Sequence, residues 1–252
     1  MTTTLTLYLV DVDRLAADPL YSDPNGLGEI DRQRAERLLD DTLRARFIAG
    51  RYALFAILGQ RYPALRTSAR GKPLLERPTE ALSWSHSGGR LLVGCASSPL
   101  EAERSDRGET PSTAIALGVD IEDASVERPL ERLAKRYFPA AEHEALRALQ
   151  GQTRQRAFYE LFTRKEALAK LDDRPLGSLL GEASFDRLDG SWRYRRVLAS
   201  ESAAGELAGH DAERPIALRG LRIDGCYEIA VALRAEAAAE ALASWRLVRF
   251  EG

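Results

Sequence analysis

Apolar and acidic residues alternate in one short segment, Leu117–Asp123, and this segment constrains the fold more than any other. Successive side chains of a β-strand point to opposite faces, so Val119 and Ile121 are expected to enter a core. Asp120 and Glu122 then share the other face. Two carboxylates this close repel each other unless a cation lies between them, and oxygen ligands favour Mg²⁺ or Mn²⁺ over Zn²⁺. The segment therefore predicts a strand with a cation-binding face.

A second segment, Phe162–Lys170, supplies a third carboxylate. The apolar residues in and around it recur at spacings of three and four, which predicts a helix with one face in the core. Glu166 and Lys170 are four residues apart, so they lie on neighbouring turns of one helix face. A third acid and a cation suited to phosphate are thus expected side by side.

Composition excludes several classes of protein. The 252 residues are 44% hydrophobic and 29% charged, which is typical of a globular chain. A formal net charge of -2 gives no basic field, so no nucleic-acid partner is expected. No segment is long and apolar enough to span a membrane, and the N-terminus lacks an export signal. Cys95 and Cys226 lie in apolar runs where free buried thiols are expected, which favours the cytoplasm.

The first half of the chain is predicted to form one lobe, residues 1–112. Its expected elements are a strand at 5–10, a helical region at 30–59 and a hairpin at 81–97 that turns near Ser87–Gly89. The stretch 99–112 is rich in Glu, Arg, Ser and Gly and almost free of apolar residues. We expect it to be a surface loop at the boundary between lobes.

Residues 113–252 are predicted to form a second lobe. Its expected elements are a strand at 113–121, helices at 130–138 and 141–149, a longer helix capped by Thr153, and strands at 183–188, 191–198, 216–223, 226–233 and 245–250. The stretch 199–214 is expected to be another surface loop.

The two halves are alike in the order of their elements, and Leu82–Ala96 resembles Leu221–Ala232 in pattern. This weak repeat predicts an α+β fold of two similar, pseudo-symmetric lobes. Each lobe would pack a long helix on a small antiparallel sheet, with a ligand cleft between the lobes.

The segment Ser85–Gly89 places hydroxyls, an imidazole and flexible backbone N–H groups at a strand end, which is a combination that can hold phosphate. Taken alone, it equally suits a polar hairpin turn. A Ser–His hydrolase triad is excluded because Ser85 and His86 are adjacent on a strand and point to opposite faces. The glycine-rich fingerprints of P-loop and Rossmann nucleotide enzymes are absent.

Four blocks of this sequence together resemble the Sfp-type 4'-phosphopantetheinyl transferase family. They are Arg46–Gly50, Gly71–Pro73, Trp84–Gly88, and Gly118–Glu122 coupled to Phe162–Lys170. The blocks span residues 46 to 170. The last third of the chain matches only in its strand pattern and in Gly225-Cys226-Tyr227.

The resemblance implies a Mg²⁺-dependent enzyme, with Mn²⁺ as a substitute, that transfers the 4'-phosphopantetheine moiety of coenzyme A to a serine of an apo carrier protein. Adenosine 3',5'-bisphosphate would be released. The carriers would be acyl, peptidyl or polyketide carrier domains, and the enzyme a cytoplasmic monomer. By resemblance the metal ligands are Asp120, Glu122 and Glu166. The implied contacts to coenzyme A come from Arg46, Lys72, Ser85, His86, Lys165 and Lys170, with a looser match at Arg32 and Arg34.

The base that takes the proton of the carrier serine is left open between two carboxylates. Glu142 matches an acidic position of the family, and Glu166 lies at the metal. Glu142 equally suits a helix N-terminal acid that stabilises the helix dipole. Carrier domains of this chemistry tend to be acidic, so a basic helical face is a candidate docking surface. Its residues are Arg128, Arg132, Lys135 and Arg136.

Two alternatives remain at this stage. A catalytically silent relative would bind coenzyme A or a carrier without transfer, but such a protein is expected to have lost a metal carboxylate, and none is missing. A Mg²⁺ phosphohydrolase would account for the carboxylates but not for the three upstream blocks.

Overall fold

The computed structural model describes residues 3–59, 65–99, 115–195, 216–235 and 238–251. The predicted surface loops at 99–112 and 199–214 lie almost wholly outside these residues. The helices are α1 (Val12–Ala16), α2 (Glu29–Glu36), α3 (Asp41–Leu58), α4 (Leu130–Tyr137), α5 (Ala140–Arg147), α6 (Gly151–Leu171), α7 (Leu176–Glu182) and α8 (Ala238–Ala243), with 3-10 turns at Pro19–Tyr21 and Pro24–Gly26. The strands are β1 (Thr4–Asp11), β2 (Arg66–Thr67), β3 (Pro73–Leu74), β4 (Glu80–Ser87), β5 (Arg90–Ser97), β6 (Ala116–Asp123), β7 (Ser184–Leu188), β8 (Ser191–Arg195), β9 (Ile216–Ile223), β10 (Tyr227–Arg234) and β11 (Arg246–Phe250).

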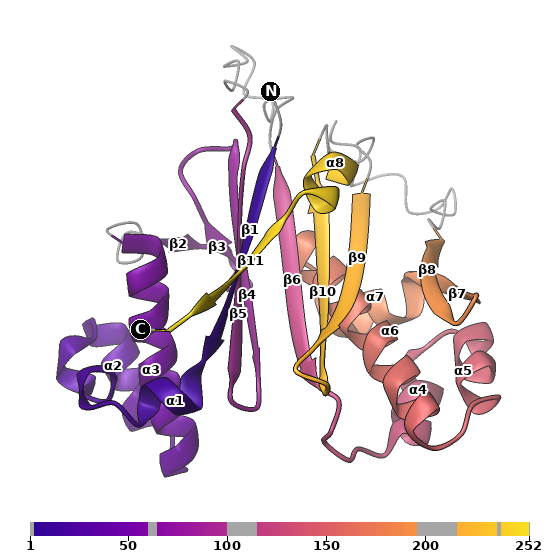
Figure 1. The fold of residues 1–252 in the computed structure, drawn as a ribbon, viewed down its shortest axis with the longest axis horizontal. Helices are drawn as coiled ribbons and strands as arrows, with labels where there is room; N and C mark the ends of the chain where they lie inside the picture. The colour runs from indigo at the N-terminus through magenta and orange to yellow at the C-terminus, as the bar shows by residue number, and fades with distance from the viewer. Residues whose placement is uncertain (1–2, 60–64, 100–114, 196–215, 236–237, 252) are drawn as a thin grey trace.

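A four-stranded sheet in the order β11-β1-β5-β4 forms the N-terminal part of the fold. Strand β5 pairs antiparallel with both β1 and β4, whereas β11 pairs parallel with β1. Helices α1 to α3 lie together beside this sheet (Figure 1). The buried side chains of α3, among them Ala49, Ala53 and Leu54, share a core with Leu91 and Val93 of β5.

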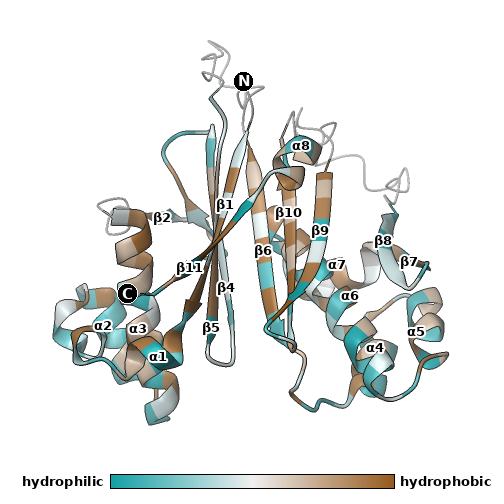
Figure 2. Cartoon of the chain, in the orientation of Figure 1, coloured by the Kyte–Doolittle hydropathy of each residue, from teal (hydrophilic) through white to brown (hydrophobic). Residues whose placement is uncertain are grey.

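A three-stranded antiparallel sheet in the order β6-β10-β9 forms the C-terminal part. Strand β10 is the central strand, and almost all of its side chains are buried because one face packs on the core shared with the first sheet and the other on α6. Helix α6 packs against β6 and β10, and α4, α5, α7 and the β7–β8 hairpin lie around α6 (Figure 1). Figure 2 shows hydrophobic bands along β10 and a mixture of hydrophobic and hydrophilic bands on β6.

The edge strands of the two sheets, β4 and β6, lie side by side and are joined by serine side chains. The Val119 backbone N–H donates to Ser83 Oγ over 3.0 Å, and the Asp123 N–H donates to Ser87 Oγ over 3.1 Å. The increasing residue numbers of the partners show that β4 and β6 run parallel. Side chains thus satisfy backbone donors that a neighbouring strand would satisfy within a continuous sheet.

Most elements predicted from the sequence are confirmed, including the hairpin at 81–97 and the long helix that carries Glu166. The helical region at 30–59 is confirmed but comprises two helices, because the chain breaks after α2 and Asp40 caps a new helix by accepting the Leu43 N–H at 2.8 Å. The predicted cap at Thr153 is wrong, since α6 starts at Gly151 without a side-chain cap. Helices α1, α7 and α8 were not predicted.

The α+β class is confirmed, whereas the pseudo-symmetry of two lobes stays a prediction. The predicted boundary between residues 112 and 113 falls in a stretch that the structure does not describe. Strand β11, near the C-terminus, nevertheless adds to the N-terminal sheet through its pairing with β1. No helix among the described residues is long and apolar enough to cross a membrane.

Gly118 of β6 lets the backbone of α6 approach the sheet directly. A Cβ atom at Gly118 would lie 1.9 Å from the carbonyl oxygen of Ala167 and 2.5 Å from the nitrogen of Leu171. Both atoms belong to the α6 backbone, so they cannot yield as a flexible side chain does. The distance between β6 and α6, and therefore between their carboxylates, depends on the missing Cβ.

We expect Gly118→Ala to destabilise the protein by about 3 kcal/mol or more, since α6 must shift to make room. The measurement is the free energy of unfolding in denaturant. Gly177→Ala is the matched control, because a Cβ there meets no atom within 4 Å. In helix α7 that change is expected to alter stability by only about 1 kcal/mol, towards greater stability. Equal effects of the two substitutions would contradict this account of the α6–β6 contact.

Candidate functional site

Asp120 lies at the seam between the two sheets and is only 1% exposed. Its Oδ1 atom accepts a hydrogen bond from Ser85 Oγ at 2.6 Å and one from Lys170 Nζ at 2.7 Å. Its Oδ2 atom is buried and accepts no hydrogen bond from the described residues. A buried carboxylate oxygen without a donor is costly and calls for a positive partner.

Glu122 lies two residues further along β6, as the alternating pattern predicted. Its Oε2 atom accepts from Ser87 Oγ at 3.0 Å and from Arg128 Nη2 at 3.2 Å. Burial, and next the negative charge of Asp120, raise the pKa of Glu122 above its usual range, and Arg128 opposes the rise. The serines of β4 therefore hydrogen bond to both carboxylates of β6.

Glu166 brings the third carboxylate from α6, with Lys170 Nζ 3.9 Å from its Oε2 atom. Burial, and next the charge of Asp120, raise the pKa of Glu166 to about 8; Glu122 adds to the rise and Lys170 opposes it. Burial and the neighbouring acids thus raise the pKa of both Glu122 and Glu166, which lie beside a single ammonium group. The sequence-based grouping of Asp120, Glu122, Glu166 and Lys170 is therefore reproduced in space.

The oxygen atoms of this cluster suit a hard divalent cation, because all of them belong to carboxylates. One of them, Asp120 Oδ2, accepts no hydrogen bond from the described residues. As placed in the described part of the chain, no three His, Cys, Asp or Glu side chains stand close enough together to hold a metal ion. Lys170 instead supplies the positive charge between Asp120 and Glu166. The oxygen chemistry of the cluster suits Mg²⁺, and the assignment of Asp120, Glu122 and Glu166 as its ligands stays a prediction.

Lys165 and Glu142 lie in a different place from the one that the family resemblance implied. They form an ion pair with 2.8 Å between Lys165 Nζ and Glu142 Oε2, and the side chains are 0% and 1% exposed. Lys165 also donates to the carbonyl oxygens of Leu180 and Ala183, and Glu142 accepts the Phe185 N–H at 2.8 Å. Neither side chain has a surface open to coenzyme A or to a carrier serine.

Burial raises the pKa of Glu142 and lowers that of Lys165, while the attraction between the two charges opposes both shifts. The pair joins α5 and α6 to the end of α7 and the start of β7. Lys165 and Glu166 are adjacent in sequence but point to different sides of α6, since successive residues of a helix are about 100° apart. One residue faces the core and the next faces the carboxylate cluster.

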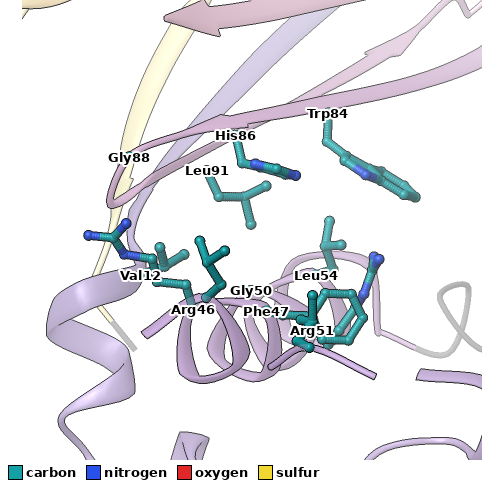
Figure 3. Close-up of a pocket in the computed structure, with 12 residues that line it drawn as sticks. Val12, Arg46, Phe47, Gly50, Arg51, Leu54, Trp84, His86, Gly88 and Leu91 are labelled. Carbon is teal, nitrogen blue, oxygen red and sulfur yellow. The ribbon is translucent and has the colours of Figure 1, made fainter. Parts of the chain in front are cut away.

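Two cavities flank strand β4 and meet at Trp84. The first has a volume of about 300 Å³ and lies between α3 and the β4–β5 hairpin (Figure 3). Trp84, His86 and Gly88 line it, whereas Ser83, Ser85 and Ser87 point to β6. The predicted opposite orientation of Ser85 and His86 is thus what the structure shows.

The floor of the first cavity is apolar and its rim is cationic. Phe47 and Arg51 face Trp84 and His86 across it (Figure 3). His86 is exposed, but the protein atoms around the ring remove part of the water from it. This desolvation, and next the positive charges of Lys170 and Arg51, lower the pKa of His86. An aromatic floor with a cationic rim suits a purine that carries a phosphate.

Arg46 lines the same cavity but is engaged by Asp13. Its Nε and Nη2 atoms donate to the two oxygens of Asp13 over 2.6 Å and 2.9 Å. Arg51, which the sequence did not single out, lies over the Phe47 ring at 4.5 Å, with its Nε 3.3 Å from Asp31 Oδ1. Arg51 directly follows the block Arg46–Gly50, and this position in the sequence could have identified it.

The second cavity, of about 530 Å³, lies beside Lys170 and the end of α6. Four cations line it, together with one acid and an aromatic ring. Its cationic and aromatic lining comprises Arg70, Lys72, Lys170, Arg174 and Trp84, and its acid is Asp173. Lys72, predicted to hold the adenosine end, donates its ammonium to the carbonyl oxygen of Leu171 at 2.7 Å.

The remaining candidates lie on the surface. Arg32 pairs with Glu29 on α2, and Arg34 is exposed on the same helix. Of the proposed docking residues, Arg128 pairs with Glu122 at 3.2 Å, Arg132 and Lys135 are exposed on α4, and Arg136 lies over the Tyr137 ring. Arg128 precedes α4, whereas Arg132, Lys135 and Arg136 lie on the helix, so the basic residues extend from the carboxylate cluster onto α4.

Comparison with known proteins shows which family part of this chain resembles. Residues 116–219 match the model of the 4'-phosphopantetheinyl transferase superfamily. The match includes β6 and α6, which carry all three carboxylates. Residues 116–219 are thus similar to this superfamily, which agrees with the resemblance inferred from the sequence.

Individual relatives match longer stretches of the chain. The 4'-phosphopantetheinyl transferase psf-1 of Bacillus pumilus is 27% identical over 176 residues, which is 69% of this chain and 62% of that protein. The 4'-phosphopantetheinyl transferase HetI of Nostoc sp. is 33% identical over 146 residues, 54% of this chain and 55% of that protein. The matched stretches thus span less than two thirds of either relative.

Breaking the buried pair is expected to be costly. Lys165→Met or Glu142→Gln should each destabilise the protein by about 3–5 kcal/mol, because each leaves one charge or its acceptors buried and unpaired. The double variant should lose less than the sum of the two, as the free energy of unfolding in denaturant will show. Lys135→Met on α4 is the control and should change stability by at most about 0.5 kcal/mol. Additive losses would contradict a direct pair.

Proposed function

We propose that this protein transfers the 4'-phosphopantetheine moiety of coenzyme A to a serine hydroxyl of an apo carrier protein and releases adenosine 3',5'-bisphosphate. The observation that carries the proposal is the cluster of Asp120, Glu122 and Glu166 around Lys170, between two cationic cavities that meet at Trp84. The superfamily match and the names of the relatives support the same reaction.

Coenzyme A has an adenosine end with a 3'-phosphate, a central pyrophosphate and a pantetheine arm. The cavity at Phe47, Arg51 and His86 has the aromatic and cationic groups that suit the adenosine end. Arg46 forms part of the wall of this cavity and is held there by its hydrogen bond to Asp13. The pyrophosphate then lies near Ser85, Lys170 and the carboxylates. The arm is left to run towards the carrier.

The carboxylates would hold Mg²⁺, or Mn²⁺ in its place, with Asp120, Glu122 and Glu166 as ligands. When bound, the ion supplies positive charge to the pyrophosphate oxygens. Lys170 moves from Asp120 to a phosphate oxygen, a change of partner that keeps its charge paired. Ser85 holds Asp120 in place by its 2.6 Å hydrogen bond.

Transfer forms a bond between the serine oxygen and the phosphorus that carries the pantetheine arm. The bond from that phosphorus to the bridging oxygen breaks, and adenosine 3',5'-bisphosphate leaves with the bond electrons. The serine proton goes to a carboxylate. We assign that step to Glu166, because it lies at the carboxylate cluster beside Lys170 and because Glu142 is buried against Lys165.

The finer features of the sequence-based prediction belong to the same proposal. The acceptors are acyl, peptidyl or polyketide carrier domains of fatty-acid, polyketide or nonribosomal peptide biosynthesis. They dock on the basic face of α4, and the enzyme acts as a cytoplasmic monomer of two similar lobes. The exposed Arg132 and Lys135 offer charge complementary to an acidic carrier helix.

Incubation with an unmodified carrier, coenzyme A and Mg²⁺ should add one phosphopantetheine group to the carrier, as intact mass spectrometry detects. Chelation should abolish the addition. Asp120→Asn should reduce the rate by roughly 10²–10³, since it weakens the charge that binds the ion. Asp189→Asn is the control, because Asp189 is exposed, distant in the β7–β8 turn, and tolerant of Asn at its positive φ. No addition to fatty-acid, polyketide or peptide-synthetase carriers would overturn the proposal.

The cavity assignment predicts a phosphate-specific defect. Arg51→Met should raise KM for coenzyme A by about tenfold, because a charged hydrogen bond to phosphate is lost. The same change should leave KM for 3'-dephosphocoenzyme A nearly unaltered. Arg193→Met, an exposed arginine of β8, should alter neither value. An equal rise for both substrates would place Arg51 away from the 3'-phosphate.

A further inference from the structure

The C-terminal end of α6 is closed by an unusual set of partners. The Arg174 N–H donates to the carbonyl oxygen of Ala169 at 2.9 Å, and Asp173 adopts a positive φ of 50°. This is the hydrogen-bond pattern of a Schellman motif, with an aspartate at the position that glycine usually takes. The motif leaves later carbonyl groups of the helix, including that of Leu171, in need of donors.

Those donors come from the turn between β2 and β3, in the N-terminal part of the fold. Lys72 Nζ donates to the Leu171 carbonyl oxygen at 2.7 Å, and Arg70 Nη1 donates to the Asp173 carbonyl oxygen at 3.1 Å. A third cation, Arg234 of β10, pairs with Asp172 at 2.5 Å. Cations at this end of a helix are favoured by the helix dipole.

The β2–β3 turn is built to present Lys72. The Ser68 N–H donates to the Lys72 carbonyl oxygen at 2.9 Å, and Ser68 Oγ accepts the backbone N–H groups of Lys72 and Arg70 at 3.1 Å and 3.2 Å. Gly71 has a φ of 85°, which is a conformation that glycine adopts without strain. Burial lowers the pKa of Lys72, as expected for an ammonium held inside a contact.

The capped turn is the one that carries the groups of the carboxylate cluster. Lys170 precedes Leu171 directly, and Glu166 lies about one turn earlier. Helix α6 packs closely against β6 at Gly118. Its C-terminal end is held by the hydrogen bond from Lys72 to the Leu171 carbonyl oxygen. The orientation of Lys170 towards Asp120 therefore depends on a hydrogen bond from the N-terminal part of the fold.

We propose that Lys72 is a positioning residue: it caps the C-terminus of α6 from the β2–β3 turn and thereby holds Lys170 and Glu166 in register with Asp120. This role replaces the direct contact to the adenosine end that the family resemblance implied for Lys72. The consequence for catalysis rests on the proposed function, whereas the cap itself does not.

Hydrogen–deuterium exchange of the ligand-free protein tests the cap without any reaction. Lys72→Met keeps the length of the side chain and removes its charge. Peptides covering residues 168–175 should exchange about tenfold faster in this variant, while peptides from the middle of α6, residues 155–162, should not change. Arg246→Met, which removes an exposed cation from β11, is the control and should leave both unchanged. Unaltered exchange at 168–175 in Lys72→Met would overturn the proposal.

A second variant protects the test against a general loss of structure. Arg70 is exposed, so Arg70→Gln should preserve the fold and still remove the bond to the Asp173 carbonyl. We expect a smaller acceleration of exchange, confined to the same peptides. Melting temperatures within a few degrees of the original protein would establish that both variants are folded.

Kinetics separates positioning from binding. Lys72→Met should lower kcat for transfer by about tenfold with KM for coenzyme A nearly unchanged, because the misplaced groups act in the transition state. A raised KM with unchanged kcat would instead show a direct contact to coenzyme A and contradict the positioning role. If the original protein transferred nothing, the proposed function would fail, and the exchange result would still decide the cap.

Discussion

Serine side chains join the edge strands of the two sheets, which also share an apolar core that includes Leu7 and Val119, and the carboxylates of β6 lie at this junction. Ser83 and Ser87 accept backbone N–H groups of β6, and Ser85 donates to Asp120. Because side chains rather than backbone atoms join β4 to β6, the strands remain adjacent without forming one continuous sheet. The space between them is then available to acidic side chains, which a closed ladder of backbone hydrogen bonds would not admit.

That arrangement explains why like charges gather there. Asp120 and Glu122 are rigid because they belong to a strand whose neighbours on both sides are fixed. Glu166 approaches from α6 only as closely as Gly118 allows. Burial, and next repulsion from Asp120, raise the pKa of Glu166 to about 8, and Lys170 opposes the rise. A cluster of acids with raised pKa values beside a cavity is a candidate functional site, and it agrees with the proposed reaction.

The sequence predicted this cluster well, because strand alternation and the spacing of Glu166 and Lys170 are local properties that geometry fixes. It predicted the surroundings of Lys165, Glu142 and Lys72 poorly. Their partners are backbone carbonyls and an acid from distant elements, α5, α7 and the end of α6. No local pattern encodes such partners. The break between α2 and α3 was missed for another reason, since Asp40 is one of several acids there and only its cap geometry distinguishes it.

Helix α6 shows how one short motif divides between stability and chemistry. Lys165 and Lys170 are both lysines near Glu166, yet one is fully buried against Glu142 and the other lies partly open beside Asp120. A five-residue separation rotates a side chain by about 500°, or 140° beyond a full turn, so the two cannot share a face. Three acceptors surround the compact ammonium group of Lys165, so a lysine is satisfied at this buried position. The face of the helix therefore separates a lysine that stabilises the interior from one that lies beside the carboxylate cluster.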